Sequence, residues 1–448
     1  MNLRPSALCF FLLTELASCS SQHPTPAAAP KLLQEDGRIA VLLGEIDPRR
    51  IRATDSALVS FGTRNSYSDT LSTTRGIGAA RRWIHAQLSQ YSRDCGGCLR
   101  VEFDTGTVET PRDTVARQRR ITNVLAWLPG RDTTRVIVIG GHYDSCVCAV
   151  PPGRGRDSVS TAPGANDDGS GSSAVIELAR VFSRLFSKGL DVTVIFALHD
   201  AEEQGLLGSS HLAKRLKSGG YKVVAGMTDD IVGNVTAEDG TVDSTSVRIF
   251  APDPDTSRSR ELARYVWSIG DSYLPNFRVV PVWRLDRVGR GGDHRSYIEQ
   301  GSAGLRFTER IENEKRQHRP TDQLAWVNFG YVANVARLNA ASVAALGLAP
   351  ATPDSARAAR DVPVTGGRRW TLTWLPVSGA VSYEVLLRPT TSPQYERVIA
   401  VGSGTRYELD VQLDDLWAGL RAVGANGHRS LPAVVPRVTP RAAQAAEP

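Results

Sequence analysis

The stretch Gly164-Ala165-Asn166-Asp167-Asp168-Gly169-Ser170-Gly171 places two adjacent carboxylates between small residues, directly before an apolar segment. Taken alone, an acidic pair in a glycine-rich turn is most often a solvated loop or a helix N-cap. Other metal-binding side chains accompany it here: His142 upstream, then Glu202-Glu203, Asp229-Asp230 and Gln317-His318 downstream. Imidazoles and carboxylates in this order suit a hydrolytic site that holds two metal ions.

The segments around this stretch predict an α/β fold. Arg135–Gly140 and Asp191–Leu198 are continuous apolar runs, typical of strands covered on both faces. Gly171–Lys188 lies between them and carries its apolar residues at helical spacing. Strand, helix, strand predicts a sheet with at least one parallel crossover. Chemistry collects at the carboxyl ends of such strands, where His142, Glu202 and Glu203 follow directly.

The length and texture of the chain predict two domains. With 448 residues, the chain is too long for one ordinary core. We expect a first domain over residues 32–348, a proline-rich linker over 349–361 and a tail over 439–448. Residues 362–438 contain short alternating strands separated by turns, which predict a small β-sandwich.

Three pieces of this second domain resemble a fibronectin type III domain. They are LTWLPV (Leu372–Val377), YEVLLR (Tyr383–Arg388) and GLRAVGANGHRS (Gly419–Ser430). Another small β module is the alternative interpretation. The resemblance implies a role in binding or spacing.

The first 19 residues are typical of an export signal. Arg4 precedes the apolar run Ala7–Leu13, which is too short to span a bilayer. Leu16-Ala17-Ser18-Cys19 resembles a bacterial lipobox, which implies that Cys19 is lipidated and that residues 20–31 form a tether. We therefore expect an exported protein of the bacterial envelope, in the periplasm or at the outer membrane, attached to the membrane only through this anchor. A plain secretory signal, cleaved nearby, is the alternative.

The charge pattern argues against nucleic acid as a partner. The formal net charge is +6, but basic residues are dispersed among nearly as many acidic ones. The sequence has no basic helix with interleaved aromatic residues, which a nucleic-acid interface would favour.

Four cysteines follow the signal, as Cys95 with Cys98 and Cys146 with Cys148. In an exported protein, disulfides are the default expectation. Four cysteines allow three pairings, and the sequence leaves the choice open. A CxxC redox centre and a structural zinc site are the alternatives.

Residues Phe61–Gly347 resemble the M28 family of zinc peptidases through five motifs in the family's order. The motifs are GGHYDS (Gly140–Ser145), GANDDGSG (Gly164–Gly171), HDAEEQGLLGS (His199–Ser209), TDDIVGN (Thr228–Asn234) and RQHRPTD (Arg316–Asp322). The resemblance implies a mixed, mainly parallel sheet flanked by helices and two Zn²⁺ ions per chain. It further implies an exported metallo-aminopeptidase that acts on a peptide or protein substrate.

The resemblance also assigns the metal ligands. It implies that His142 and Asp230 bind one zinc, that Glu203 and His318 bind the other, and that Asp167 bridges both. Of the pair Asp229-Asp230, the alignment on Ile231-Val232-Gly233 selects Asp230.

The same resemblance places Glu202 as the general base. It implies that Asp144 orients the imidazole of His142, that Asp168 is structural and that Asp293 helps to orient the site. Many relatives carry a tyrosine where this chain has Gln317, so a tyrosine role at the oxyanion is in doubt.

Three alternatives remain open. A glutaminyl cyclase resembles the same fold but uses a single zinc. A carboxypeptidase-like relative would need an arginine to clamp a C-terminal carboxylate, and Arg287, Arg290, Arg295 and Arg306 keep that open. A binding protein on an inactive peptidase scaffold would have lost ligands, whereas this chain retains all five.

Overall fold

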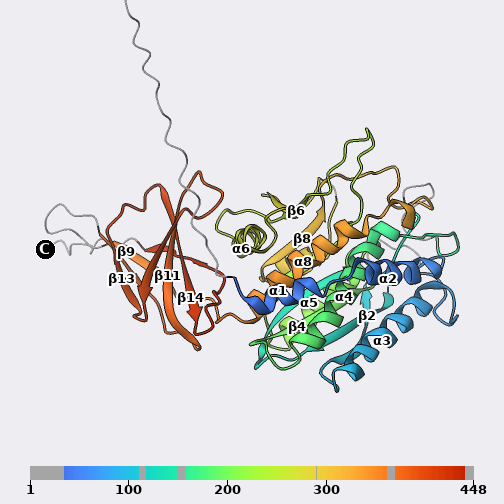
Figure 1. Ribbon diagram of the computed structural model, residues 1–448, viewed down its shortest axis with the longest axis horizontal. Helices are drawn as coiled ribbons and strands as arrows, with labels where there is room; N and C mark the ends of the chain where they lie inside the picture. The colour runs from blue at the N-terminus through green and yellow to red at the C-terminus, as the bar shows by residue number, and fades with distance from the viewer. Residues whose placement is uncertain (1–34, 110–117, 149–156, 289, 361–368, 439–448) are drawn as a thin grey trace, which may run out of the picture.

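The computed structural model describes residues 35–109, 118–148, 157–288, 290–360 and 369–438. The predicted signal with Cys19, the tether over residues 20–31 and the tail over residues 439–448 lie outside the described residues. Figure 1 shows two units side by side, a larger α/β unit and a smaller unit of strands near the C-terminus. None of the helices within the described ranges is both long and apolar enough to cross a membrane.

The larger unit contains the helices of the described residues and the first eight strands. The helices are α1 (Gly37–Gly44), α2 (Pro48–Ser60), α3 (Gly76–Asp94), α4 (Gly171–Leu185), α5 (Leu207–Ser218), α6 (Arg258–Tyr273), α7 (His294–Glu299) and α8 (Phe329–Gly347), with the short turns η1 (Ala165–Ser170) and η2 (Leu324–Trp326). The strands are β1 (Arg100–Glu109), β2 (Gln118–Leu128), β3 (Asp132–His142), β4 (Val192–His199), β5 (Lys222–Asp229), β6 (Ser246–Phe250), β7 (Arg278–Val282) and β8 (Gly304–Glu309).

These strands form one sheet in the order β1-β2-β4-β3-β5-β8-β6-β7. The central strands β4, β3, β5 and β8 run parallel, and β6 pairs in parallel with β7. The pairs β1–β2, β2–β4 and β6–β8 are antiparallel. The predicted mixed α/β sheet is confirmed, and these three antiparallel strand pairs lie on either side of its parallel centre.

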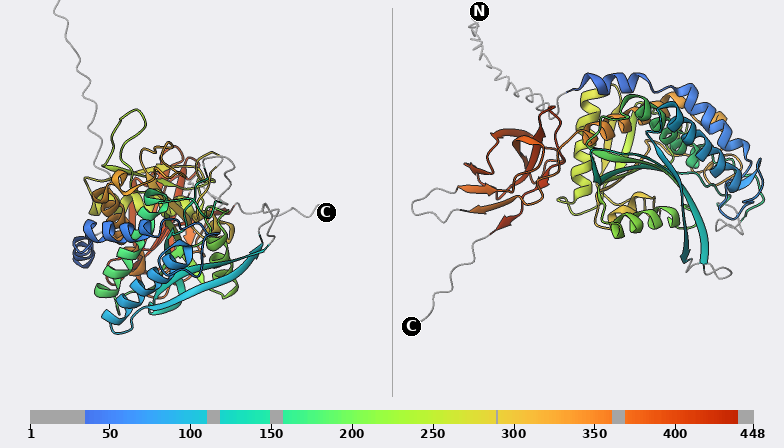
Figure 2. Two further views of the ribbon diagram at one scale, coloured as in Figure 1. Left: turned by 90° about the vertical axis from the view of Figure 1, so that its right-hand side faces the viewer. Right: turned by 90° about the horizontal axis from the view of Figure 1, so that it is seen from below.

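Helices cover both faces of the sheet, which explains the continuous apolar runs in its central strands. In β3, Ile137 and Ile139 belong to the core shared with α3, α4 and α8. Val136 and Val138 alternate with them and pack on the other face with Leu212 and other residues of α5. Figure 2 shows helices on both sides of the curved sheet. Because both faces of these strands are covered, their sequences are nearly continuous apolar runs instead of alternating apolar and polar residues.

The smaller unit consists of two four-stranded sheets. Its strands are β9 (Arg357–Arg360), β10 (Trp370–Thr373), β11 (Ala380–Pro389), β12 (Arg397–Gly402), β13 (Arg406–Leu409), β14 (Leu416–Gly424), β15 (Ala433–Val434) and β16 (Arg437–Val438). One sheet has the order β13-β10-β9-β16 and the other β12-β11-β14-β15. Trp370 and Leu372 of the first sheet share one core with Tyr383 and Val385 of the second, so the unit is a β-sandwich.

The sandwich begins earlier in the chain than the prolines suggest. The predicted linker, residues 349–361, contains β9, which pairs with β10 over Arg357–Arg360. Only the first part of that range connects the two units. The alanines and arginines at 357–360 have a low propensity for strands. The segment is a strand because it pairs with β10.

Buried charges join the two units. Asp255, ahead of α6, accepts from Arg388 of β11 at 2.8 Å and also pairs with Arg264 of α6. Tyr395 Oη donates to the buried carboxylate of Glu261 at 3.0 Å. On the other side, His428 Nε2 lies 2.8 Å from Asp36 Oδ2, beside the start of α1. These contacts fix the sandwich against the α/β unit.

Candidate metal centre

One carboxylate lies between two imidazoles at the centre of the site. Oδ1 of Asp167 is 3.3 Å from Nε2 of His142, and its Oδ2 is 3.0 Å from Nε2 of His318. Each oxygen of a single side chain thus faces a different histidine. This is the arrangement that a carboxylate bridging two metal ions requires.

The five predicted ligands come from loops at one edge of the sheet. His142 is the last residue of β3, Glu203 follows β4, and Asp230 follows β5 directly. His318 lies in the segment after β8, and Asp167 lies in η1. Because β3, β4, β5 and β8 are parallel, their carboxyl ends meet at this edge. The structure therefore brings together residues that are far apart in the sequence.

His142, Asp167 and Asp230 form a first group of candidate ligands. One ligand atom from each lies within 4.8 Å of the others. Nε2 of His142 is 3.8 Å from Oδ1 of Asp230. All three residues are buried, with exposed fractions of 1%, 4% and 5%. Within the described part of the chain, Nε2 of His142 makes no hydrogen bond, as expected of a nitrogen that is kept free for a cation.

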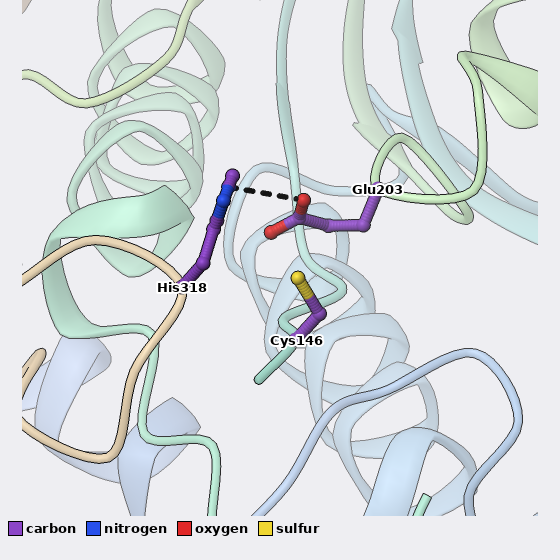
Figure 3. A group of neighbouring side chains, drawn as sticks. All are labelled: Cys146, Glu203 and His318. Atoms are coloured by element: carbon purple, nitrogen blue, oxygen red, sulfur yellow. Dashed lines mark ion pairs between the residues drawn. The ribbon is translucent and has the colours of Figure 1, made fainter. Parts of the chain in front are cut away.

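Glu203 and His318 form a second group, together with Cys146 (Figure 3). Nε2 of His318 is 3.2 Å from Oε2 of Glu203. The other oxygen, Oε1, is buried and has no hydrogen-bond partner among the described residues. An imidazole with carboxylates is a donor set that suits Zn²⁺, with Mn²⁺ or Co²⁺ as substitutes. By their chemistry and their unpartnered atoms, the residues fit two such ions.

The electrostatics of the site favour cations. Burial lowers the pKa of His142, but the carboxylates of Asp144 and Asp167 outweigh it and hold that pKa well above its ordinary value. The carboxylate of Glu203 raises the pKa of His318 to about 11. Burial raises the pKa of Asp167, yet His318 and His142 bring it well below its usual range. Both imidazoles lie in a negative field that would stabilise any bound cation.

Glu202 lies beside the two groups and is a candidate proton acceptor. Burial raises the pKa of Glu202 well above its usual range, and the carboxylates of Asp230 and Asp293 add to the increase. The positive charge of His142 opposes them. A carboxylate whose pKa is raised in a low-dielectric site is suited to accept a proton near neutral pH.

Asp144 connects the His142 loop with the Glu202 loop. Its Oδ1 is 3.4 Å from Nδ1 of His142. The same carboxylate accepts the backbone N–H of Glu202 at 3.1 Å and that of Glu203 at 3.3 Å. It thus orients an imidazole and positions both acids of the next loop.

Asp168 holds the neighbouring backbone and does not face the two groups. Its carboxylate accepts the N–H groups of His142, Gly171 and Ile231 at 3.1, 2.9 and 3.3 Å. Gly171 has to be glycine, since a Cβ there would lie 2.6 Å from both Asp168 oxygens. The peptide bond between Asp167 and Asp168 is cis.

The structure separates the roles of Asp229 and Asp230. Both oxygens of Asp229 accept from Nδ2 of Asn339 in α8, at 2.7 and 2.6 Å. Asp230 instead faces His142 and pairs with the buried Arg306, whose Nη2 is 2.9 Å from Oδ1. The choice of Asp230 as candidate ligand therefore agrees with the direction in which each carboxylate points.

Arg64 and Asp322 are supporting residues that the sequence reasoning did not assign. Arg64 is fully buried and donates to the carbonyls of Tyr143, Pro163 and Gly164 at 2.7, 2.6 and 2.8 Å. It thereby joins the His142 loop to the Asp167 loop. The carboxylate of Asp322 accepts the N–H groups of Asn166 and Asp167, both at 2.9 Å. In the sequence, Asp322 can be singled out because it ends the motif RQHRPTD, whereas Arg64 lies outside all five motifs.

Unusual backbone conformations surround the candidate ligands. Four non-glycine residues in the described ranges have positive φ: Ala201, Leu206, Ile231 and His318. Ala201 precedes Glu202, Ile231 follows Asp230, and His318 is itself a candidate. Such conformations cost about 1–3 kcal/mol each and concentrate at functional sites.

Asp293 and Gln317, two further residues that the sequence singled out, lie near the centre. Asp293 is buried, and its Oδ1 has no hydrogen-bond partner among the described residues. The neighbouring His294 points its Nε2 to the carbonyl of Leu285 at 2.8 Å. Nε2 of Gln317 donates to Glu312 at 3.4 Å, which uses one of the two N–H groups of this amide.

The arginines proposed for a carboxylate clamp are largely paired with acids. Arg306 is completely buried against Asp230 and Asp286. Arg287 pairs with Asp286 and Glu312, and Arg290 pairs with Glu312. Arg295, on α7, is the one of the four for which the described residues provide no ion pair. The paired arginines are thus committed to the protein's own carboxylates.

Both disulfides join neighbours in the sequence. Cys95 is bonded to Cys98, just after α3, and Cys146 is bonded to Cys148, just after β3. The question of pairing that the sequence left open is answered in favour of the two local bridges.

Comparison with known proteins assigns the chain to a family. Residues 123–343 match the model of Peptidase family M28. A "Probable zinc metalloprotease" of Pyricularia oryzae is 34% identical over 464 residues, covering 94% of this chain and 90% of that protein. One of Pyrenophora tritici-repentis is 34% identical over 432 residues, covering 90% and 87%.

Solved structures share the fold of the α/β unit. The LapA aminopeptidase of Legionella pneumophila aligns with a TM-score of 0.53 at 24% identity, covering 69% of this chain and 76% of that one. Glutaminyl cyclase of Porphyromonas gingivalis aligns with a TM-score of 0.52 at 19% identity, covering 67% and 98%. Since one fold carries both activities, the fold does not choose between them.

Proposed function

The chain belongs to peptidase family M28, a zinc metallopeptidase family by its relatives, and on this basis we propose that it is a two-zinc aminopeptidase. In this proposal His142 and Asp230 bind one zinc, Glu203 and His318 bind the other, and Asp167 binds both. The substrate is a peptide or protein with a free N-terminus.

The observation that carries the proposal is the position of Asp167. Its two oxygens face His142 and His318 at 3.3 and 3.0 Å, and each histidine has a further carboxylate beside it. A single-metal site needs no carboxylate placed between two imidazoles. The arrangement supports two ions that share one bridging ligand.

The chain's own residues supply the proton transfers. The two zinc ions, when bound, provide Lewis acidity for the scissile carbonyl and lower the pKa of water at the site. Glu202 accepts the proton of the attacking water and returns it to the leaving amine. Asp144 holds the backbone of Glu202 at 3.1 Å, which keeps this carboxylate in place through both transfers.

The charges around the site favour a free N-terminus over a C-terminal carboxylate. A substrate α-amine carries positive charge below its pKa of about 8. Besides the proposed zinc ligands, the centre contains the carboxyl groups of Glu202 and Asp293. The arginines that could clamp a carboxylate are mostly paired with acids of the chain.

The test compares unblocked and blocked substrates on the zinc-loaded protein. We expect hydrolysis of aminoacyl-nitroanilides and of peptides with free N-termini, but not of N-acetylated peptides. Glu202→Gln should lower kcat by about 10²–10⁴-fold while the zinc content is retained. Glu299→Gln, at an exposed position on α7, is the matched control and should behave as the wild type.

Other results would point elsewhere. Cleavage of N-acetylated peptides from their C-terminus would establish a carboxypeptidase. Cyclisation of N-terminal glutamine with one zinc per chain would establish a glutaminyl cyclase. Zinc binding without turnover of any peptide would favour an inactive scaffold that binds its partner.

We also propose export, with lipidation at Cys19. The two disulfides, Cys95–Cys98 and Cys146–Cys148, support folding in an oxidising compartment. Mass spectrometry of the mature N-terminus tests this, since a diacylated Cys19 and an unmodified N-terminus near it differ in mass. Our proposal for the sandwich, on its likeness to fibronectin type III, is a binding or spacing role.

A further inference from the structure

Cys146 lies at the second proposed zinc position. Its Sγ, a carboxylate oxygen of Glu203 and a ring nitrogen of His318 all lie within 4.8 Å of one another. Figure 3 shows the sulfur directed toward the carboxylate of Glu203. Cys146 is 4% exposed, so it belongs to the interior of the site. The candidate ligand set assigned from the sequence does not include this sulfur.

The surrounding loop holds Cys146 in this position. Ser145, its neighbour, donates to the carbonyl of Ala162 at 2.8 Å and accepts the N–H of Arg64 at 3.1 Å. Asp144 accepts the backbone N–H of Glu203 at 3.3 Å. The segment that carries the sulfur and the segment that carries Glu203 are thus tied together, and their proximity follows from this shared anchoring.

The chemical state of the sulfur decides whether it can bind metal. Cys146 is bonded to Cys148, two residues along the chain. A thiolate is a strong ligand for zinc, whereas a sulfur in a disulfide carries no negative charge to offer. The same atom is therefore a ligand in one redox state and not in the other.

We propose that the Cys146–Cys148 disulfide is a redox switch of the second zinc position; this rests on the proposed two-zinc site. In the oxidised protein, Glu203, His318 and Asp167 are the ligands, and a position is left for water and substrate. In the reduced protein, the Cys146 thiolate binds as a fourth protein ligand. A zinc with four protein ligands is closed in the manner of structural sites, so reduction strengthens metal binding and lowers turnover.

The switching step uses a dithiol, either small or on a protein. Its first thiolate attacks Sγ of Cys148, which is the less buried of the two residues. The disulfide breaks, and Cys146 leaves as the thiolate. The second thiol of the reductant then attacks the mixed disulfide, becomes a disulfide itself and releases Cys148 as a thiolate. Two electrons pass to the protein, and Cys148 takes up a proton from solvent.

Two variants that both lack the disulfide separate the sulfurs. Cys148→Ala leaves the Cys146 thiol permanently free, and Cys146→Ala leaves only Cys148. Each full-length protein is stripped of metal and titrated with Co²⁺, which reports a sulfur ligand as a thiolate-to-cobalt charge-transfer band. The wild type is titrated before and after reduction with a phosphine, and again after reoxidation.

We expect the charge-transfer band in Cys148→Ala and in the reduced wild type only. Cys148→Ala should bind its second Co²⁺ at least about tenfold more tightly than Cys146→Ala. Loss of a residue that only supports a metal ligand already costs about 10–100-fold in metal affinity, and a direct ligand should contribute no less. Reoxidation of the wild type should abolish the band.

Two equivalents of bound Co²⁺ without the band in Cys148→Ala and in the reduced wild type would overturn the switch and leave the two-metal site intact. Bands of equal strength in both variants would overturn the role of Cys146. Oxidised wild type that binds fewer than two Co²⁺ ions would overturn the two-zinc proposal and the switch with it.

Discussion

Oδ1 of Asp144 accepts the backbone N–H of Glu202 at 3.1 Å. Through this bond, the loop that presents His142 fixes the position of the candidate general base. The same carboxylate faces Nδ1 of His142 at 3.4 Å. The position of the candidate general base and that of one candidate metal ligand therefore depend on one side chain, which is completely buried.

Asp144→Asn is expected to weaken both functions together. The substitution removes the negative charge beside His142. It also replaces one carboxylate oxygen by an NH₂ group, which cannot accept the backbone N–H groups of Glu202 and Glu203. We expect zinc affinity, measured by chelator competition, to fall by about 10–100-fold. The exposed Glu299→Gln is the control, and unchanged zinc affinity in Asp144→Asn would remove the positioning role.

Asp229 and Asp230 should respond differently to the same substitution. Asp229 is held by Asn339, whereas Asp230 faces His142. We expect Asp230→Asn to bind about one zinc per chain and Asp229→Asn to bind two, as counted by elemental analysis. The reverse result would show that the ligand had been assigned to the wrong member of the pair.

Arg64→Met is expected to destabilise the α/β unit. The guanidinium satisfies three carbonyl groups from two loops, and methionine of similar length can satisfy none. We expect the free energy of unfolding in denaturant to fall by about 3 kcal/mol. Arg64→Lys retains the charge but loses the planar set of donors, so it should lie between the two. Equal stability of Arg64→Lys and the wild type would argue that charge alone matters.

Asp104 supports a stability prediction that depends on pH. Its carboxylate is 2.6 Å from Arg215, 3.2 Å from His211 and 2.9 Å from Asn123. Burial raises the pKa of Asp104, but these partners together lower it to about 2. Because the folded pKa lies below the unfolded one, the stabilisation is present above about pH 4 and is lost as pH falls toward 2.

Asp104→Asn should therefore be less stable than the wild type by about 2 kcal/mol at pH 7. The difference should shrink as the pH is lowered through about 3, as followed by thermal unfolding. The exposed Asp414→Asn is the control. A difference that stays constant from pH 7 to pH 3 would show that the ion pairs of Asp104 do not contribute.

Two central strands of the sheet, β3 and β4, were predicted from the sequence, whereas the other central strands, β5 and β8, and the short strands β6 and β7 were not. β3 and β4 appear in the sequence as continuous apolar runs, and the fold class follows from them and the helix between them. β6 and β7 are five residues each; Arg248 interrupts the apolar pattern of β6, and β7 begins at Arg278 and contains Pro281. The place of β6 in the sheet depends on its pairing with β7 and with β8, which both follow it at a distance in the sequence.

For the site, motifs located the charged residues but not what holds them. His142, Asp167, Glu203, Asp230 and His318 stand in recognisable patterns, and the structure brings them together; their roles as ligands remain predictions. Arg64 could not be found, because it binds backbone carbonyls, which every residue has. Asn339 lies on a helix about 110 residues beyond the carboxylate it holds, and only the tertiary fold connects them.

The spread of the candidate ligands from His142 to His318 has a consequence for biosynthesis. The last of them follows β8, after most of the α/β unit has been made. A chain that is still being synthesised, or one cut short before residue 318, lacks one of the five candidate ligands, His318. If the proposed ligand set is right, the newly made polypeptide has no complete two-metal site until β8 and the segment after it have been synthesised.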